Sequence, residues 1–170
     1  MENKEIKALI FDWGDTIMRD FPEKEGPMYL WDKVEWIPGA EKTLKKLFGK
    51  YILVIATNAG ASGTKEMIKA LERVGADNYF SHFFSSKELG FEKPDVRFFS
   101  SIAKKIGVQP ENCIMIGNLY EKDIVGAKAS GMKTILFNEA RLTHVFPQAD
   151  KVIYEMGELS SVMIDNLFLP

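Results

Sequence analysis

The stretch "LIFDWGDTI", Leu9 to Ile17, contains the pattern that decides the fold of this chain. An apolar run ends at Asp12, and Asp15 and Thr16 follow almost at once. A short apolar run that stops at polar residues is typical of a strand buried on both faces. The pattern therefore predicts a buried strand that presents a carboxylate at its C-terminal end.

Further apolar runs alternate with amphipathic patterns along the rest of the chain. Strands are predicted at Ile6–Phe11, Tyr51–Thr57, His82–Ser86, Cys113–Gly117, Lys133–Phe137 and Lys151–Tyr154. Helices are predicted at Ala40–Phe48, Thr64–Val74, Phe98–Ile106, Glu121–Ala129 and Glu155–Leu167. This alternation predicts an α/β fold: a three-layer α/β/α arrangement in which helices cover both sides of a mostly parallel central sheet.

The composition narrows the class of protein. A chain of 170 residues that is 46% hydrophobic fits one domain over residues 1–170. The net charge of −2, without long runs of either sign, argues against nucleic-acid binding. Cys113 is the only cysteine and is expected to be a buried thiol, which excludes a disulfide framework. The first apolar run is too short for a signal or membrane helix, so we expect a cytoplasmic protein without a membrane partner.

Polar side chains follow the predicted strands at the positions where a site is expected. In open parallel sheets, ligands bind beyond the carboxyl ends of the strands. The polar residues that come after the first four predicted strands are Asp12, Asp15, Thr57, Asn58, Lys93, Asn118 and Asp123. We therefore expect these side chains to converge at one edge of the sheet.

The residue types in this set favour phosphoryl transfer. Lys93 supplies positive charge and Thr57 a hydrogen bond for phosphoryl oxygens. Asp12 is suited to attack phosphorus and form an aspartyl-phosphate. Asp12, Asn118 and Asp123 resemble the hard-oxygen ligands of Mg²⁺. Because Pro94 suits the first turn of a helix, Lys93 is predicted to lie at the start of the following helix.

The sequence resembles the haloacid dehalogenase superfamily of phosphohydrolases, whose four motifs occur here in order. They are "FDWGDT", "VIATN", "EKPD" and "IGNLYEKD". The resemblance implies a Rossmann-like fold and an Mg²⁺-dependent phosphatase that acts on a phosphorylated substrate. It implies that Asp12 is the nucleophile and that Lys93 counters charge. It also implies that Thr57, with Asn58 beside it, binds substrate. The metal ligands it implies are Asp12, the carbonyl group of Gly14, Asn118 and Asp123.

Two positions depart from the pattern of this superfamily. Gly14 stands where an aspartate usually serves as general acid and base, a function worth roughly 10²–10⁴ in rate. Asp15 is the nearest candidate to carry the proton instead. Asn118 replaces an aspartate and removes one negative charge from the metal site. The alternative reading is a non-catalytic or weakly active phosphate-binding or regulatory protein. Dehalogenase-type hydrolysis fits less well, because it needs a lidded apolar pocket.

The segment Ile17–Gly39 is predicted to be a short loop insertion in place of a cap domain. Capless relatives tend to act on large substrates or to close the site with a neighbouring subunit. The substrate is therefore expected to be a small molecule or something larger, and a homo-oligomer is a further expectation. The aromatic residues of this loop favour either core packing or a substrate platform or oligomer contact: Phe21, Tyr29, Trp31 and Trp36.

Overall fold

A computed structural model describes residues 5–164 of the chain. Within these residues the chain forms a parallel sheet of six strands in the order β3-β2-β1-β4-β5-β6. The strands are β1 (Ala8–Phe11), β2 (Ile52–Thr57), β3 (His82–Ser85), β4 (Cys113–Gly117), β5 (Lys133–Phe137) and β6 (Lys151–Ile153). The α/β architecture predicted from the alternating pattern is confirmed.

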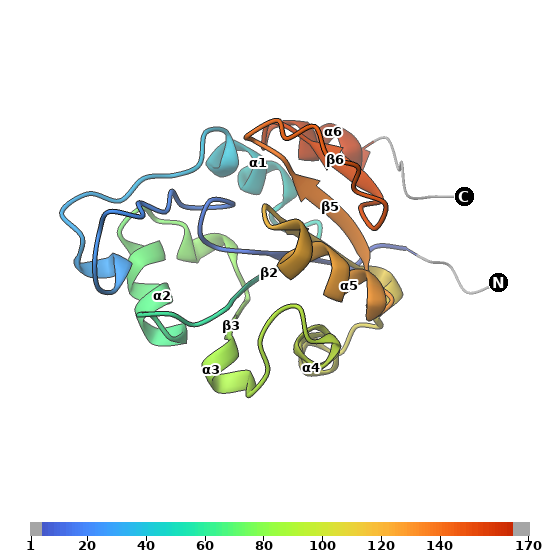
Figure 1. Cartoon of the computed structure of the whole chain (residues 1–170), viewed down its shortest axis with the longest axis horizontal. Helices are drawn as coiled ribbons and strands as arrows, with labels where there is room; N and C mark the ends of the chain where they lie inside the picture. Colours follow the sequence, from blue (N-terminus) through green and yellow to red (C-terminus); the bar gives the residue numbers. More distant parts are fainter. Residues whose placement is uncertain (1–4, 165–170) are drawn as a thin grey trace.

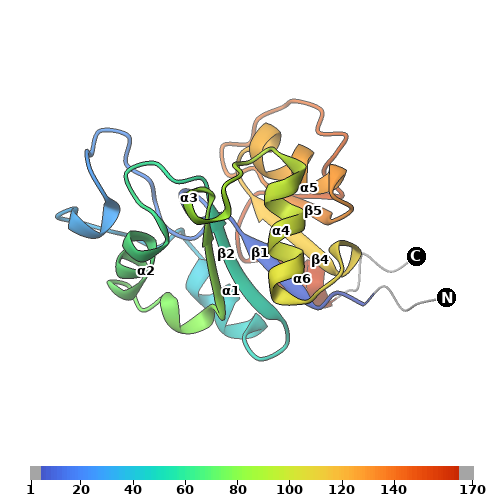
Figure 2. The same cartoon turned by 90° about the horizontal axis from the view of Figure 1, so that it is seen from below.

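Helices cover both faces of this sheet (Figures 1 and 2). The α-helices are α1 (Ala40–Leu47), α2 (Thr64–Glu72), α3 (Ser86–Leu89), α4 (Val96–Ile106), α5 (Gly126–Ala129) and α6 (Glu158–Ile164). The remaining helical turns are η1 (Met28–Leu30), η2 (Asp77–Tyr79), η3 (Pro110–Asn112) and the π-helix η4 (Tyr120–Val125). Residues of α1, α2 and α6 pack on one face, and residues of α4 and α5 pack on the other.

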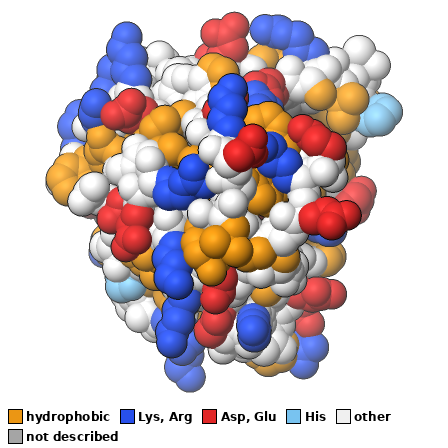
Figure 3. Space-filling model, turned by 90° about the vertical axis from the view of Figure 1, so that its left-hand side faces the viewer, with side chains coloured by type: hydrophobic (Ala, Val, Ile, Leu, Met, Phe, Trp, Pro, Cys, Tyr) orange, Lys and Arg blue, Asp and Glu red, His pale blue; other side chains and the backbone are white. Residues whose placement is uncertain are grey.

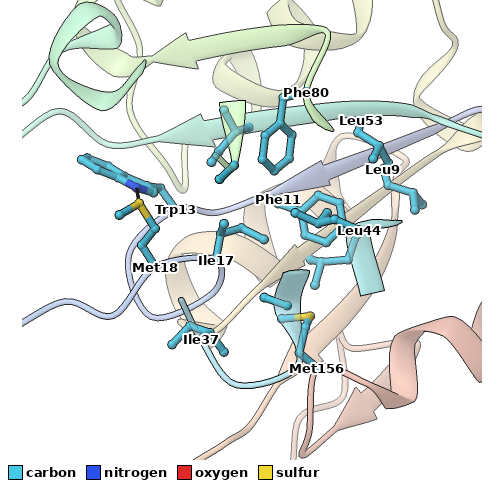
Figure 4. Close-up of a cluster of buried hydrophobic side chains, with 14 of the residues drawn as sticks. Leu9, Phe11, Trp13, Ile17, Met18, Ile37, Leu44, Leu53, Phe80 and Met156 are labelled. Carbon is cyan, nitrogen blue, oxygen red and sulfur yellow. Dashed lines mark hydrogen bonds between the residues drawn. The ribbon is translucent and has the colours of Figure 1, made fainter. Parts of the chain in front are cut away.

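Alternating strand residues build the two halves of the core. In β1, Leu9 and Phe11 belong to the first cluster, whereas Ala8 and Ile10 belong to the second. This division follows from the period of two along a strand. Figure 4 shows the first cluster, in which Phe11 packs edge-on against Phe80 with ring centroids 6.1 Å apart. Because both faces of the strand are covered, every residue of β1 is apolar and buried.

The order of the strands determines where a site can lie. Strand β1 pairs with β2 on one side and with β4 on the other, so that Phe11 lies beside both Ile55 and Ile116. From β1 the chain adds strands first on one side, β2 and β3, and then on the other side, β4 to β6. Ligands bind at such switch points, beyond the carboxyl ends of the strands. Asp12 is the first residue beyond β1, and its backbone N–H donates to the carbonyl group of Ile116 at 2.9 Å.

Several predicted element boundaries were wrong by one to three residues. Strands β1 and β2 begin later than predicted, and β3 and β6 end one residue earlier. Helices α1 and α2 end earlier, α4 begins at Val96 rather than Phe98, and α6 begins at Glu158 rather than Glu155. The last residues of the predicted Glu155–Leu167 helix lie outside the described residues. Element ends are set by capping and tertiary contacts, to which a periodicity is insensitive.

Two predictions about local structure were wrong in kind. The predicted helix over Glu121–Ala129 is a π-helix, η4, followed by the short α5. Pro94 does not occupy the first turn of α4, because the N-cap of that helix is Asp95, whose carboxylate accepts a hydrogen bond from the N–H of Arg97 at 2.8 Å. Pro94 instead follows Lys93 through a cis peptide bond, and Lys93 precedes the helix.

The loop insertion between β1 and α1 contains the 3-10 helix η1 and no other helix or strand within the described residues. Three of its aromatic residues, Tyr29, Trp31 and Trp36, pack partly buried against the core, and Phe21 contacts Trp31 with ring centroids 6.2 Å apart. The packing interpretation of these aromatic residues is therefore supported. The face of the molecule in Figure 3 carries acidic and basic side chains interspersed with hydrophobic ones.

None of the helices within residues 5–164 is both long and apolar enough to cross a lipid bilayer. Cys113 is buried in the core, and burial raises the pKa of its thiol to about 12. A thiol of that kind remains protonated and behaves as a small apolar side chain.

Candidate active site

Three buried charged side chains meet beyond the carboxyl end of β1. The ammonium nitrogen Nζ of Lys93 lies 2.7 Å from Oδ1 of Asp12 and 2.7 Å from Oδ1 of Asp123. It also donates to the carbonyl group of Ala56 in β2 at 3.3 Å. The exposed fractions of Asp12, Lys93 and Asp123 are 7%, 4% and 0%. Residues from three separate strand ends therefore form one charged cluster, as the sequence predicts.

The electrostatics of this cluster favour an additional cation. Burial opposes the charge on Lys93, but Asp12 and Asp123 outweigh it and raise the pKa of the lysine. Burial, with the nearby charge of Asp12, raises the pKa of Asp123 to about 6. Two carboxylates face one ammonium group, so the buried cluster has one negative charge in excess.

Asp123 is held by the loop that leaves β4. Its Oδ2 accepts a hydrogen bond from the N–H of Leu119 at 2.9 Å, while the turn of η4 brings the side chain back toward the end of the strand. A Cβ atom on Gly117 would lie only 2.3 Å from Oδ2 of Asp123. Residue 117 is therefore glycine because the carboxylate occupies the space that any side chain would need.

Lys93 is positioned through its backbone by Asn58. Oδ1 of Asn58 accepts from the N–H of Lys93 at 2.8 Å, and Nδ2 donates to its carbonyl group at 3.0 Å. On the other side, a Cβ atom on Gly126 would lie 2.2 Å from the carbonyl oxygen of Pro94. Helix α5 thus approaches the Lys93–Pro94 segment more closely than any side chain at position 126 permits.

The two other predicted polar residues lie at the same edge of the sheet. Thr57 is buried at the end of β2, and its hydroxyl group donates to the carbonyl group of Asn58 at 3.3 Å. Asn118 directly follows β4, and its Oδ1 lies 3.4 Å from the hydroxyl group of Thr16. Asn118 therefore connects the loop after β4 to the loop after β1.

Asp15 is engaged by its own loop instead of by the charged cluster. It adopts the left-handed conformation, with φ of 54°, and its Oδ1 accepts from Arg19 at 3.2 Å and from the N–H of Asp20 at 3.1 Å. Arg19 also binds Glu139 through two hydrogen bonds of 2.7 and 2.8 Å. The carboxylate predicted to carry the proton is thus shared with a guanidinium group and a backbone amide.

Asp20 is a neighbour of the site that the sequence analysis missed. A Cβ atom on Gly14 would lie 3.5 Å from Cβ, 3.7 Å from Oδ2 and 3.8 Å from Cγ of Asp20. Although Asp20 is exposed, partial desolvation and the charge of Asp15, with a smaller effect of Asp12, raise the pKa of its carboxyl group. No spacing rule relates positions 14 and 20, and only the path of the loop brings them together.

The oxygen atoms near this cluster suit a hard divalent cation. Among residues 5–164 no group of three or more His, Cys, Asp or Glu side chains forms a metal site. The candidate oxygen donors are the carboxylates of Asp12 and Asp123, together with the neutral side-chain oxygen of Asn118 and the carbonyl oxygen of Gly14. Mg²⁺ typically binds one or two carboxylates and completes its shell with water and substrate phosphate. The excess negative charge is consistent with that requirement.

Comparisons with known proteins agree with this architecture. The chain is 34% identical over 131 residues to glyceraldehyde 3-phosphate phosphatase of Methanothermobacter thermautotrophicus, covering 76% of this chain and 54% of that protein. It is 28% identical over 168 residues to the pyrimidine 5'-nucleotidase PynA of Streptococcus pneumoniae, covering 97% of this chain and 70% of that protein. The chain spans about half the length of the glyceraldehyde 3-phosphate phosphatases that it matches.

A solved structure supports the same fold. The HAD-hydrolase YfnB from Bacillus subtilis, bound to magnesium, superimposes with a TM-score of 0.77 and 19% identity, covering 94% of this chain and 99% of that chain. Residues 10–137 match the family described as haloacid dehalogenase-like hydrolase. That match includes all four strand-end motifs and most of the parallel sheet, and it shows that the chain belongs to the haloacid dehalogenase-like hydrolase family.

Proposed function

We propose that this chain is an Mg²⁺-dependent phosphoester hydrolase that works through an aspartyl-phosphate on Asp12. The observation that carries the proposal is the bridge of Lys93 between Asp12 and Asp123 at the carboxyl ends of the strands. Phosphoryl transfer of this kind requires a carboxylate nucleophile and positive charge close to it, and Asp12 and Lys93 meet that requirement.

Each residue of the site has a separate proposed role. An oxygen of Asp12 attacks phosphorus, and Lys93 offsets the negative charge that accumulates on the phosphoryl oxygens. Thr57, at the end of β2, would donate to those oxygens once its hydroxyl group turns from the carbonyl group of Asn58. Asn58 was predicted to bind substrate, but its amide group is occupied by Lys93, so its side chain acts by positioning the lysine.

The residues that would hold Mg²⁺ are Asp12, Asn118, Asp123 and the carbonyl group of Gly14. When bound, the metal ion supplies charge neutralisation between the nucleophile and the phosphate. Lys93 already binds Oδ1 of both carboxylates, whereas Oδ2 of Asp12 accepts no hydrogen bond from the residues that the structure describes. That oxygen is therefore the one available for a cation or for attack.

The names of the relatives support a phosphorylated small molecule as substrate, since they include phosphatases of a triose phosphate and of pyrimidine nucleotides. Gly14 and Asn118 stand at two positions where the family usually has aspartate. The second candidate function is therefore a protein that binds phosphate without turnover. One domain over the given chain and a homo-oligomer both stay predictions, and sedimentation of the purified chain tests the second.

A phosphate-release assay separates the two candidates. Wild type, Asp12→Asn and the control Asp77→Asn are incubated with phenyl phosphate, with Mg²⁺ or with EDTA. We expect release by wild type and Asp77→Asn with Mg²⁺, and none by Asp12→Asn or in EDTA. Asp77 belongs to η2 before β3, at the opposite end of the sheet. An inactive wild type that still binds inorganic phosphate would support the binding protein and overturn the hydrolase.

A further inference from the structure

Gly14 lacks the carboxyl group that members of this family usually have at this position to exchange protons with the substrate. The carboxyl group of Asp20 lies against the same position. The Asp20 carboxyl carbon lies 3.8 Å from the Cβ position of residue 14, and Oδ2 lies 3.7 Å from it. An aspartate at position 14 would project from that Cβ. The carboxyl group of Asp20 thus lies next to the place where the missing one would begin.

The path of the chain after β1 explains this placement. The carbonyl group of Trp13 accepts hydrogen bonds from the N–H groups of Thr16, Ile17 and Met18, so the chain turns sharply. A parallel bridge between Gly14 and Met18, with the N–H of Asp15 donating to the carbonyl group of Met18 at 2.7 Å, then holds the segment after the turn against Gly14. The N–H of Asp20 donates to Oδ1 of Asp15 at 3.1 Å, and this hydrogen bond fixes the backbone position from which the Asp20 side chain projects.

Asp20 differs from four nearby carboxylates in having no basic partner among the described residues. Asp15 and Glu139 are both bound by Arg19. Asp12 and Asp123 are both bound by Lys93. Within residues 5–164 the structure shows no ion pair to Asp20, so no basic side chain neutralises its carboxyl group there.

We propose that Asp20 is the general acid and base of the reaction, in place of the residue that Gly14 lacks. The inference rests on the proposed phosphoester hydrolysis. In the first step an Asp12 oxygen forms a bond to phosphorus, the bond from phosphorus to the leaving oxygen breaks, and the carboxylic acid of Asp20 gives that oxygen its proton. In the second step water attacks phosphorus, the carboxylate of Asp20 takes the proton, and the bond to Asp12 breaks. The products are the alcohol and phosphate.

Leaving groups of different basicity test this assignment. Phenyl phosphate releases a phenol with a pKa of about 10, as for tyrosine, and needs a proton from the enzyme. Dinitrophenyl phosphate releases a far more acidic phenol and needs none. For Asp20→Asn we expect kcat on phenyl phosphate to fall by roughly 10²-fold or more, with little change in KM. On dinitrophenyl phosphate we expect a normal burst followed by slow turnover and accumulation of aspartyl-phosphate.

Control and rescue variants distinguish a catalytic role from a structural one. Glu25→Gln removes an exposed charge from the same loop and is expected to retain wild-type rates. Gly14→Asp in the Asp20→Asn background returns a carboxyl group to the pocket, and φ at Gly14 lies outside the positive region that disfavours side chains. We expect kcat of this double variant on phenyl phosphate to be at least about tenfold higher than kcat of Asp20→Asn.

The possible outcomes separate this inference from the proposed function. Wild-type rates for Asp20→Asn on both substrates would overturn the role of Asp20. The same reduction in kcat on phenyl phosphate and in the burst on dinitrophenyl phosphate would also overturn it. A loss that follows Asp15→Asn instead would assign the proton transfer to Asp15 and overturn the inference. Loss of all turnover in Asp12→Asn with an active wild type would still uphold the hydrolase. If wild type releases no phosphate, the hydrolase proposal fails and the role of Asp20 fails with it.

Discussion

The side-chain amide of Asn58 binds both backbone polar groups of Lys93, accepting from its N–H at 2.8 Å and donating to its carbonyl group at 3.0 Å. The two residues are 35 positions apart in sequence, and this pair of hydrogen bonds joins the end of β2 to the segment before α4. The ammonium group of Lys93 reaches Asp12 and Asp123 from a backbone that is held in place.

Asn58→Ala should therefore weaken both the fold and the activity. The N–H and carbonyl groups of Lys93 lose their partners in a partly buried setting, so the free energy of unfolding should fall by about 1–3 kcal/mol. Phosphate release should fall by about tenfold or more, because Lys93 is no longer positioned. Urea unfolding and the phosphate assay measure the two effects. Asn78→Ala, at an exposed asparagine, should change stability by less than about 0.5 kcal/mol.

Lys93→Met should be far more destabilising than Asp12→Asn when Mg²⁺ is absent. Removal of the ammonium group leaves two buried carboxylates without the cation that they share, and breaking a buried ion pair in this way costs about 3–5 kcal/mol. Asp12→Asn removes the excess negative charge and leaves Lys93 paired with Asp123. Its stability should equal or exceed that of wild type. Equal losses for both variants in EDTA would contradict the charge excess.

Gly117→Ala should disrupt the site through a steric clash. Its Cβ would lie 2.3 Å from Oδ2 and 2.4 Å from Cγ of Asp123, so the carboxylate or the strand must shift. Overpacking of this kind costs about 1–3 kcal/mol. Thermal unfolding and the Mg²⁺ dependence of phosphate release should both change. The matched control is Gly157→Ala, whose Cβ meets no atom within 4 Å, and an equal effect there would exclude the clash as the cause.

Glu139→Gln should lower stability at neutral pH but not in acid. The hydrogen-bonded guanidinium group of Arg19 lowers the pKa of Glu139 from its ordinary value of 4.5. The folded state therefore binds a proton at Glu139 less tightly than the unfolded state does. The ion pair stabilises the fold fully above the ordinary pKa of 4.5, and this stabilisation disappears as the pH falls through the lower pKa of the folded state. Because both side chains are partly exposed, the effect at about pH 7 should be about 0.5 kcal/mol. Urea unfolding at about pH 7 and about pH 3, at low salt, measures it.

Much of the fold follows from local patterns. The β-branched run at Tyr51–Thr57 and the apolar run at Cys113–Gly117 are buried on both faces, and such runs form central parallel strands. Element ends were less predictable. Phe48 continues an apolar pattern but forms a bridge with Tyr51, so α1 ends at Leu47. The π-helix at Tyr120–Val125 has no sequence signal, because its extra residue per turn is stabilised by contacts at the end of β4.

The convergence of Asp12, Lys93 and Asp123 could be predicted because parallel strands bring their carboxyl ends to one edge of a sheet. The partner of each side chain could not be predicted in the same way. Asn58, predicted to bind substrate, binds the backbone of Lys93 through its side chain, and Asp15, predicted to carry a proton, binds Arg19. Side-chain amides and carboxylates bind whichever donor the loops bring within about 3 Å, and loop paths are not periodic.

The sequence by itself determined the parallel α/β architecture and the set of polar residues at one edge of the sheet, because continuous apolar runs and amphipathic helical patterns can both be read locally. Only the tertiary structure decided that Asp20 lies against Gly14, that Asn58 positions Lys93 and that Gly117 makes room for Asp123. These relationships depend on distances of a few ångströms between segments remote in sequence, and such distances result from the packing of the whole chain.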